Sequence, residues 1–256
     1  MSPRGWRAGA NLATLANALL GAGAVGYALT GNPRFALLLI TGAIGFDGLD
    51  GLLSRRAGGE PRVLGRVLDS VADAVSFAIA PAILVAYPTF DFGAWQPYTL
   101  LARLVGVELG ALALARLVYF TWRGHASPHF VGASTPQNLL AVAIVLLFFD
   151  VPAFAGERPL LALAMIALLA PLMVLPVPYP KMRRGTALRP AMTLTSLALA
   201  AALLPQQWWP PPGSFWYSFS EVAAGLAAVG IATYYVLGPR SVRLEELARP
   251  EGASHA

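Results

Sequence analysis

Eight long apolar segments constrain the fold of this chain more than any other feature. They lie at residues 12–30, 34–54, 67–88, 97–121, 135–150, 158–178, 187–204 and 216–237. A helix of about 20 apolar residues spans the hydrocarbon core of a bilayer. Only 12% of the residues are charged, against roughly a quarter in soluble domains. The sequence therefore predicts an all-α, polytopic transmembrane bundle of about eight helices. The count stays between six and eight, because the fifth segment is short and the second carries two aspartates.

The positions of the basic residues predict how this bundle is oriented. If all eight segments cross, most of the 18 Lys and Arg residues fall on one side, and Arg34 and Arg158 lie on the other. Positively charged loops mark the cytoplasmic face, so we expect both termini in the cytoplasm. We interpret the N-terminus as a first membrane helix rather than a signal peptide, because it lacks a convincing cleavage site. We expect one integral membrane domain, residues 1–238, and a short cytoplasmic tail, residues 239–256.

Composition excludes several kinds of function. The chain has no cysteine, so disulfides, thiolate metal sites and cysteine nucleophiles are excluded. The pI near 9.9 does not indicate nucleic acid as a partner, because the basic residues are divided among short loops. That distribution favours contact with anionic membrane lipid.

Four aspartates interrupt the second and third apolar segments. Asp47 and Asp50 are three residues apart, and Asp69 and Asp73 are four apart. Residues at these spacings share one face of a helix. The short linker lets the two helices fold back antiparallel, so we expect the two pairs of carboxylates to face each other near the cytoplasmic surface.

Four neighbouring carboxylates in a membrane protein need a counter-charge. If all were ionised and about 5 Å apart, they would repel by on the order of 15–20 kcal/mol at an effective dielectric constant of 20. Bound divalent cations relieve this repulsion better than protonation does, and carboxylate oxygens suit Mg²⁺ or Mn²⁺. Two such ions are the usual clamp for displacement at phosphorus. We favour a metal site over helix caps or surface ion pairs, although spacing alone does not name the reaction.

The spacing of the acids also resembles a known family signature. The stretch Asp47-x-x-Asp50-Gly51-x-x-Ser54-Arg55, nine residues, Gly65-x-x-x-Asp69-x-x-x-Asp73 is similar to the motif of the CDP-alcohol phosphotransferases. Ser54 stands where the family usually has alanine. The resemblance implies a membrane enzyme that cleaves a CDP-activated lipid or alcohol at its pyrophosphate.

The resemblance also implies roles for the motif residues. Asp47, Asp50 and Asp69 are expected to be the main ligands of two divalent cations, with Asp73 as a further ligand and the general base. It implies a CDP-binding set composed of Gly51, Ser54, Arg55 and Gly65. Two alternatives stay open: the glycines serve close helix packing, and Arg55 is only a topology signal.

A narrower resemblance concerns the acceptor. "DSVADAVSFAIAPA", from Asp69, and "PVPYPKMRRG", from Pro176, are similar to segments of the bacterial and archaeal phosphatidylserine synthase branch. This resemblance implies transfer of a phosphatidyl group from CDP-diacylglycerol, or an ether-lipid equivalent, to L-serine, with release of CMP. The chain departs from the branch after Arg116, where Tyr119 and Thr121 replace the usual arginine and asparagine.

Several polar residues outside the motif have two readings each. Four basic side chains are candidates to bind an acceptor carboxylate or phosphate, or simply anionic headgroups: Arg116, Lys181, Arg183 and Arg184. Asn11, Thr14 and Asn17 share a face of the first helix, and either line the substrate site or make interhelical hydrogen bonds. By resemblance we also expect a homodimer.

Two alternative functions remain open at this stage. A sister enzyme would use inositol phosphate, glycerol phosphate or another alcohol as the acceptor. A cation or proton transporter would also place acids inside a membrane domain, but along a path through it.

Overall fold

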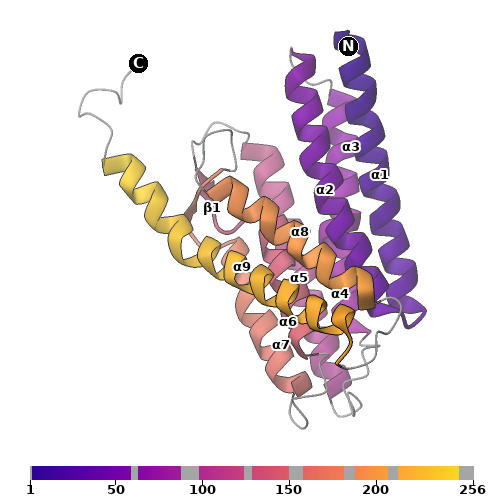
Figure 1. Cartoon of the computed structure of the whole chain (residues 1–256). Coiled ribbons are helices and arrows are strands. Elements are labelled where there is room, and N and C mark those ends of the chain that lie inside the picture. Colours follow the sequence, from indigo (N-terminus) through magenta and orange to yellow (C-terminus); the bar gives the residue numbers. More distant parts are fainter. Residues whose placement is uncertain are drawn as a thin grey trace.

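The computed structural model describes residues 2–58, 63–87, 98–123, 129–149, 158–181, 188–206 and 213–247, and these are almost entirely helical (Figure 1). The longer helices are α1 (Pro3–Leu29), α2 (Pro33–Ala57), α5 (Thr99–Arg123), α6 (Thr135–Phe149), α7 (Arg158–Leu169), α8 (Leu188–Gln206) and α9 (Phe215–Leu247). The third segment combines α3 (Val63–Ala74), a π-helical turn η1 (Val75–Ile79) and α4 (Ala80–Ala86) without a break. A 3-10 turn, η4 (Ala170–Met173), continues α7. Each predicted apolar segment therefore contains a helix, and the all-α prediction is confirmed.

Local sequence explains why α1 and α2 form an antiparallel hairpin. Ser2 and Asn32 cap the two helices, and each side-chain oxygen accepts a hydrogen bond from the backbone N–H three residues later, at 3.3 and 3.2 Å. A proline follows each cap, where its fixed φ suits the first helical turn. Gly31 lies between the helices with φ of 84°, a left-handed conformation that favours glycine.

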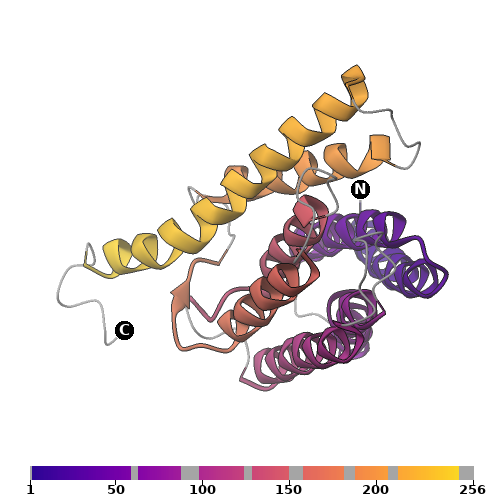
Figure 2. The ribbon, with the colours of Figure 1, turned by 90° about the horizontal axis from the view of Figure 1, so that it is seen from below.

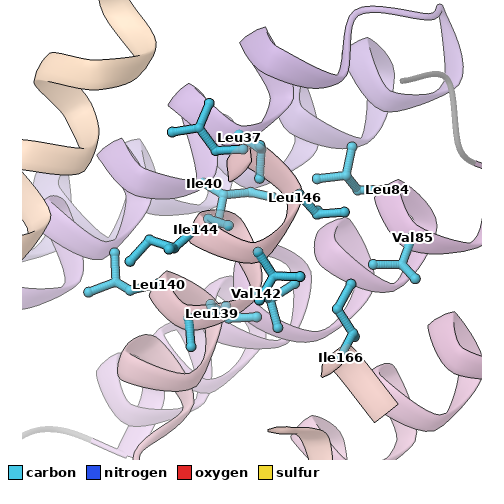
Figure 3. Packing of buried hydrophobic residues seen from close by; sticks show 14 of the residues in the cluster. Leu37, Ile40, Leu84, Val85, Leu139, Leu140, Val142, Ile144, Leu146 and Ile166 are labelled. Carbon is cyan, nitrogen blue, oxygen red and sulfur yellow. The ribbon is translucent and has the colours of Figure 1, made fainter. Parts of the chain in front are cut away.

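Helix α6 forms the centre of the bundle. Its residues from Leu139 to Leu147 are at most 6% exposed on every side, as expected for a helix that is apolar all round. Figure 3 shows labelled α6 side chains packed among apolar residues of three other helices: Leu37, Ile40, Leu84, Val85 and Ile166. In Figure 2, α8 and α9 lie on one side of this centre, and α4 and α5 lie on the other.

Four helices in the described part of the chain are long and apolar enough to cross a membrane: Pro3–Leu29, Pro33–Ala57, Val67–Ala86 and Phe215–Leu244. Shorter apolar helices lie at Thr135–Phe148, Pro159–Met173 and Leu188–Leu204. Many large apolar side chains on the outer faces are more than half exposed, among them Leu12, Leu168 and Val229. These features indicate a multi-pass membrane protein. Helix α9 continues past residue 238, where we expect the membrane domain to end. Because no break in the structure marks that residue, the boundary stays a prediction.

Two short strands join parts of the chain that are distant in sequence. β1 (Phe130–Val131) pairs antiparallel with β2 (Pro178–Tyr179). Gly132 follows β1 with φ of 76°, and a Cβ there would overlap the carbonyl of Met173. The backbone N–H of Ala133 donates to Leu172 O at 2.8 Å. This junction fixes the start of α6 against the end of α7.

A glycine permits the close contact between α4 and α5, and its substitution should destabilise the fold. A Cβ on Gly106 would lie 2.6 Å from the carbonyl oxygen of Ala82 and 2.8 Å from Ala86 Cβ. Gly106→Ala is therefore expected to lower the free energy of unfolding by about 1–3 kcal/mol, because backbone must move. The midpoint of denaturation of the detergent-solubilised protein measures this. Gly225→Ala in α9, where a Cβ meets no described atom within 4 Å, is the control. Equal midpoints for the two variants would contradict the prediction.

Candidate functional site

Helices α2 and α3 bring three of the four aspartates together. One carboxylate oxygen from each of Asp47, Asp69 and Asp73 lies within 4.8 Å of the other two. The three residues are half-buried. This convergence is what the helical spacing predicts, with Asp47 from α2 facing Asp69 and Asp73 from α3.

The cluster fits a divalent cation by its chemistry. At about 5 Å in an effective dielectric of 20, each pair of carboxylates repels by about 3 kcal/mol. Among the described residues, no lysine or arginine forms an ion pair with Asp47 or Asp73, although Arg55 lies near Asp47. Oxygen ligands grouped in this way suit Mg²⁺ or Mn²⁺.

Asp50 adjoins this cluster from a more buried position. Its side chain is 7% exposed and lies beside that of Asp69. Its Oδ2 accepts a hydrogen bond from Thr14 Oγ1 of α1 at 2.8 Å. Asp50 is therefore oriented by α1, and its role as a metal ligand stays a prediction.

Asp73 has a second partner from α1. Asn17 Nδ2 donates to Asp73 Oδ1 at 3.0 Å, and Asn17 is fully buried. Of the two readings that the sequence left open for Thr14 and Asn17, the structure shows interhelical hydrogen bonds, and both bonds end on the acidic cluster. The sequence did not indicate which aspartate each residue contacts.

The predicted CDP-binding residues lie around the cluster on α2 and α3. A Cβ on Gly65 would meet no described atom within 4 Å, and one on Gly51 would meet only the guanidinium of Arg55 on the same helix. Close helix packing therefore does not account for either glycine among the described residues. Arg55 and Ser54 are exposed, and Ser54 Oγ donates to the Gly51 carbonyl at 3.2 Å.

Two of the predicted acceptor residues share one aromatic ring. The Arg116 guanidinium carbon lies 5.4 Å from the centroid of the Phe130 ring, and Lys181 Nζ lies 5.5 Å from it. Arg116 is buried, and its Nη1 donates to Val131 O at 2.7 Å and Met173 O at 2.8 Å. Because Arg116 is buried, binding of a lipid headgroup by this side chain is disfavoured. Its two hydrogen bonds to backbone carbonyls are structural contacts that the sequence did not predict.

The structure gives less information on the other residues that bear on the acceptor. Arg183 and Arg184 lie outside the described residues. Thr121, at a position where the chain departs from the serine branch, lies with its Oγ1 3.5 Å from Ser70 Oγ. Because Ser70 follows Asp69 in α3, the end of α5 is next to the helix that carries two of the acids.

Comparison with known proteins agrees with this arrangement of acids. The sequence profile of the CDP-alcohol phosphatidyltransferase family matches residues 7–177, which include all four aspartates and both α1 partners. The chain belongs to the CDP-alcohol phosphatidyltransferase family. The resemblance read from the motif is thereby confirmed.

Three relatives of this chain belong to one branch of the phosphatidyltransferase family, the branch named for serine. A CDP-diacylglycerol–serine O-phosphatidyltransferase of Mycobacterium leprae is 39% identical over 133 residues, 50% of this chain and 43% of the relative. An archaetidylserine synthase of Methanothermobacter thermautotrophicus is 30% identical over 172 residues, 67% of this chain and 69% of the relative. A CDP-diacylglycerol–serine O-phosphatidyltransferase of Helicobacter pylori is 30% identical over 177 residues, 68% of this chain and 72% of the relative. The match thus spans less than half of the first relative and about 70% of the other two.

Proposed function

We propose that this protein transfers a phosphatidyl-type group from a CDP-linked lipid, CDP-diacylglycerol or an ether-lipid equivalent, to the hydroxyl of L-serine and releases CMP. The observation that carries the proposal is the convergence of Asp47, Asp69 and Asp73 within 4.8 Å, inside the segment that matches the family. The relatives named for transfer to serine support the choice of acceptor.

The acidic cluster supplies the metal ligands in this proposal. Asp47, Asp50 and Asp69 would hold two divalent cations, Mg²⁺ or Mn²⁺, with Asp73 as a further ligand. When bound, such ions neutralise the pyrophosphate and the departing phosphate.

Asp73 acts as the general base. The serine hydroxyl oxygen attacks the phosphorus that carries the lipid, and the bond from that phosphorus to the CMP oxygen breaks. CMP leaves with the electron pair of that bond, and Asp73 takes the proton from the hydroxyl. A base must reach that proton directly or through one water.

The two glycines of the motif support binding of the nucleotide beside the cluster. A Cβ on Gly65 would meet no described atom within 4 Å, so CDP can approach the helix backbone there. A Cβ on Gly51 would lie 3.3 Å from the Arg55 guanidinium, so glycine at this position leaves room for that side chain beside the nucleotide. Arg55, which is exposed next to Asp47, contacts the phosphates, and Ser54 lies one residue before it.

The acceptor binds on the side of α5 and β2. Lys181 is half-buried beside Phe120 and Phe130 and is a cation suited to the serine carboxylate. Arg116, Arg183 and Arg184 complete the proposed basic set, with Arg116 acting from its buried position.

The membrane orientation and the assembly are part of the same proposal. Basic residues gather where α1 begins and α2 ends: Arg56 lies over Trp6 at 5.3 Å, and Arg7 Nη2 donates to Gly58 O at 3.2 Å. Positive residues mark the cytoplasmic side, so the acidic cluster faces the cytoplasm, close to that surface. Both termini lie on that side, residues 1–238 form the catalytic domain, and the enzyme works as a homodimer.

An incorporation assay tests the reaction and the acceptor. Purified protein in vesicles containing CDP-diacylglycerol, with Mg²⁺ or Mn²⁺, is supplied with labelled L-serine, inositol phosphate or glycerol phosphate. We expect label from serine in the lipid fraction and an equal amount of CMP. Incorporation of inositol phosphate but not serine would overturn the acceptor, and an absence of CMP with every acceptor would overturn the reaction.

A further inference from the structure

The contact between α1 and the turn that follows Asp73 is unusually close. The π-helical turn η1 (Val75–Ile79) begins two residues after Asp73, and such turns are frequent at functional sites. Ser76 in this turn is fully buried, and its Oγ donates to the backbone carbonyl of Asn17 at 2.8 Å. A Cβ on Gly21 would lie 2.7 Å from Ser76 Cα and overlap its hydroxyl, so only glycine permits this approach.

Asn17 therefore connects two neighbouring points of the same segment. Its backbone carbonyl receives the Ser76 hydroxyl, and its side-chain Nδ2 donates to Asp73 Oδ1 at 3.0 Å. An amide that faces a carboxylate must present its N–H₂ group, since the carboxylate only accepts. This fixes the orientation of the amide and ties one of the two Asp73 oxygens to α1.

Packing alone does not account for an amide at this position. Asn17 Oδ1 is buried without a hydrogen-bond partner in the part of the chain that the structure describes. A buried carbonyl oxygen without a partner is unfavourable, and a leucine of similar shape would avoid that cost. What the amide adds over leucine is the N–H that Asp73 accepts.

We propose that Asn17 is a positioning residue for the general base: it holds Asp73 Oδ1 so that Oδ2 is directed at the acceptor hydroxyl. This inference rests on the proposed function, because it assigns Asn17 to the proton-transfer step carried out by Asp73. Asn17 itself touches neither substrate, and it acts through Asp73. Ser76 and Gly21 hold the π-helical turn in the register that this contact needs.

The main test is Asn17→Leu, which keeps the approximate shape and removes the donor. We expect kcat for CMP release to fall about 10- to 100-fold, less than the roughly 100- to 10,000-fold that a general base contributes in full, because Asp73 is still present but no longer held in place. We expect KM for the CDP-lipid and the affinity for Mn²⁺, measured by electron paramagnetic resonance, to change less than about threefold, because binding groups stay in place. Thr41→Val, which removes a buried hydroxyl of α2 bonded within its own helix, is the matched control and should keep the wild-type kcat.

A double-mutant cycle distinguishes positioning from a merely structural role. In an Asp73→Asn background, Asn17→Leu should lower the residual rate less than about threefold, since its target has already lost its function as a base. A full second loss in that background would overturn the inference, as would Asn17→Leu with wild-type kcat. If Asn17→Leu fails to fold, Asn17→Asp, which has the same size, must lower kcat at least as far, because it replaces the donor with a second carboxylate.

Failure of the proposed function would give a different result. If the wild-type protein released no CMP with any acceptor, the reaction itself would be wrong. An active wild type combined with an unaffected Asn17→Leu variant would overturn only the role of Asn17.

Discussion

Asp73→Asn should lower kcat for CMP release by about 100- to 10,000-fold, the range contributed by a general base. An asparagine has the size of aspartate, and its carbonyl oxygen can still accept the hydrogen bond from Asn17. The bundle should therefore keep its fold. The amide cannot take a proton from the acceptor hydroxyl, so the chemical step is what fails. CMP release by purified protein in vesicles, at saturating CDP-lipid and serine, measures the loss.

Metal binding separates the two roles proposed for Asp73. Three carboxylates remain in the variant, so we expect it to retain Mn²⁺ with reduced affinity while turnover is nearly abolished. Glu108→Gln is the control, because it neutralises a half-buried carboxyl of α5 that lies outside the cluster. Wild-type turnover by Asp73→Asn would remove Asp73 from the mechanism. Ion flux in the wild type without any nucleotide turnover would favour a transporter.

The helices and the acidic cluster were predictable because each depends on local sequence. Apolar segments of membrane length predict helices. The predicted start of the second segment, residue 34, agrees with α2, but α1 begins at Pro3, well before the predicted residue 12, because its first turns are too polar to belong to an apolar segment. The three- and four-residue spacings place Asp47 with Asp50, and Asp69 with Asp73, on shared faces. A short linker between the two helices then suffices to bring the pairs together.

The partners of the acids were not predictable in the same way. Spacing placed Thr14 and Asn17 on one face of the first helix, but the rotation of α1 about its axis depends on packing against α2 and η1. That packing decides that Thr14 reaches Asp50 and that Asn17 reaches Asp73. The π-helical turn, which brings Ser76 to α1, has no signal in the residue pattern that we identified.

The environment of Arg116 could not be predicted from the sequence either. Its two carbonyl partners, Val131 and Met173, lie 15 and 57 residues away along the chain. Val131 lies in β1 and Met173 ends η4. They come together through the hydrogen bond from Ala133 N–H to Leu172 O and the pairing of β1 with β2, two strands of two residues each. Strands this short leave no periodic pattern, so the sequence could only suggest an anion ligand.

The contacts of Arg116 predict a large effect on stability. Arg116→Met should lower the free energy of unfolding by about 3–5 kcal/mol, because two hydrogen bonds from a charged donor are lost at roughly 1.5–3 kcal/mol each. Methionine keeps the apolar stem but leaves the carbonyls of Val131 and Met173 without this donor. Denaturation of the detergent-solubilised protein, followed by loss of helical signal, measures the change.

Arg103→Met is the matched control, because Arg103 lies on the same helix but is exposed; its unfolding midpoint should stay close to that of the wild type. If Arg116 served only to bind the acceptor, Arg116→Met would raise KM for serine and leave stability unchanged. A loss of stability at unchanged KM would instead mean that the guanidinium acts wholly on the protein backbone. In that case Lys181, Arg183 and Arg184 would have to supply the positive charge for the acceptor carboxylate, and Lys181→Met should raise KM for serine without lowering the unfolding midpoint.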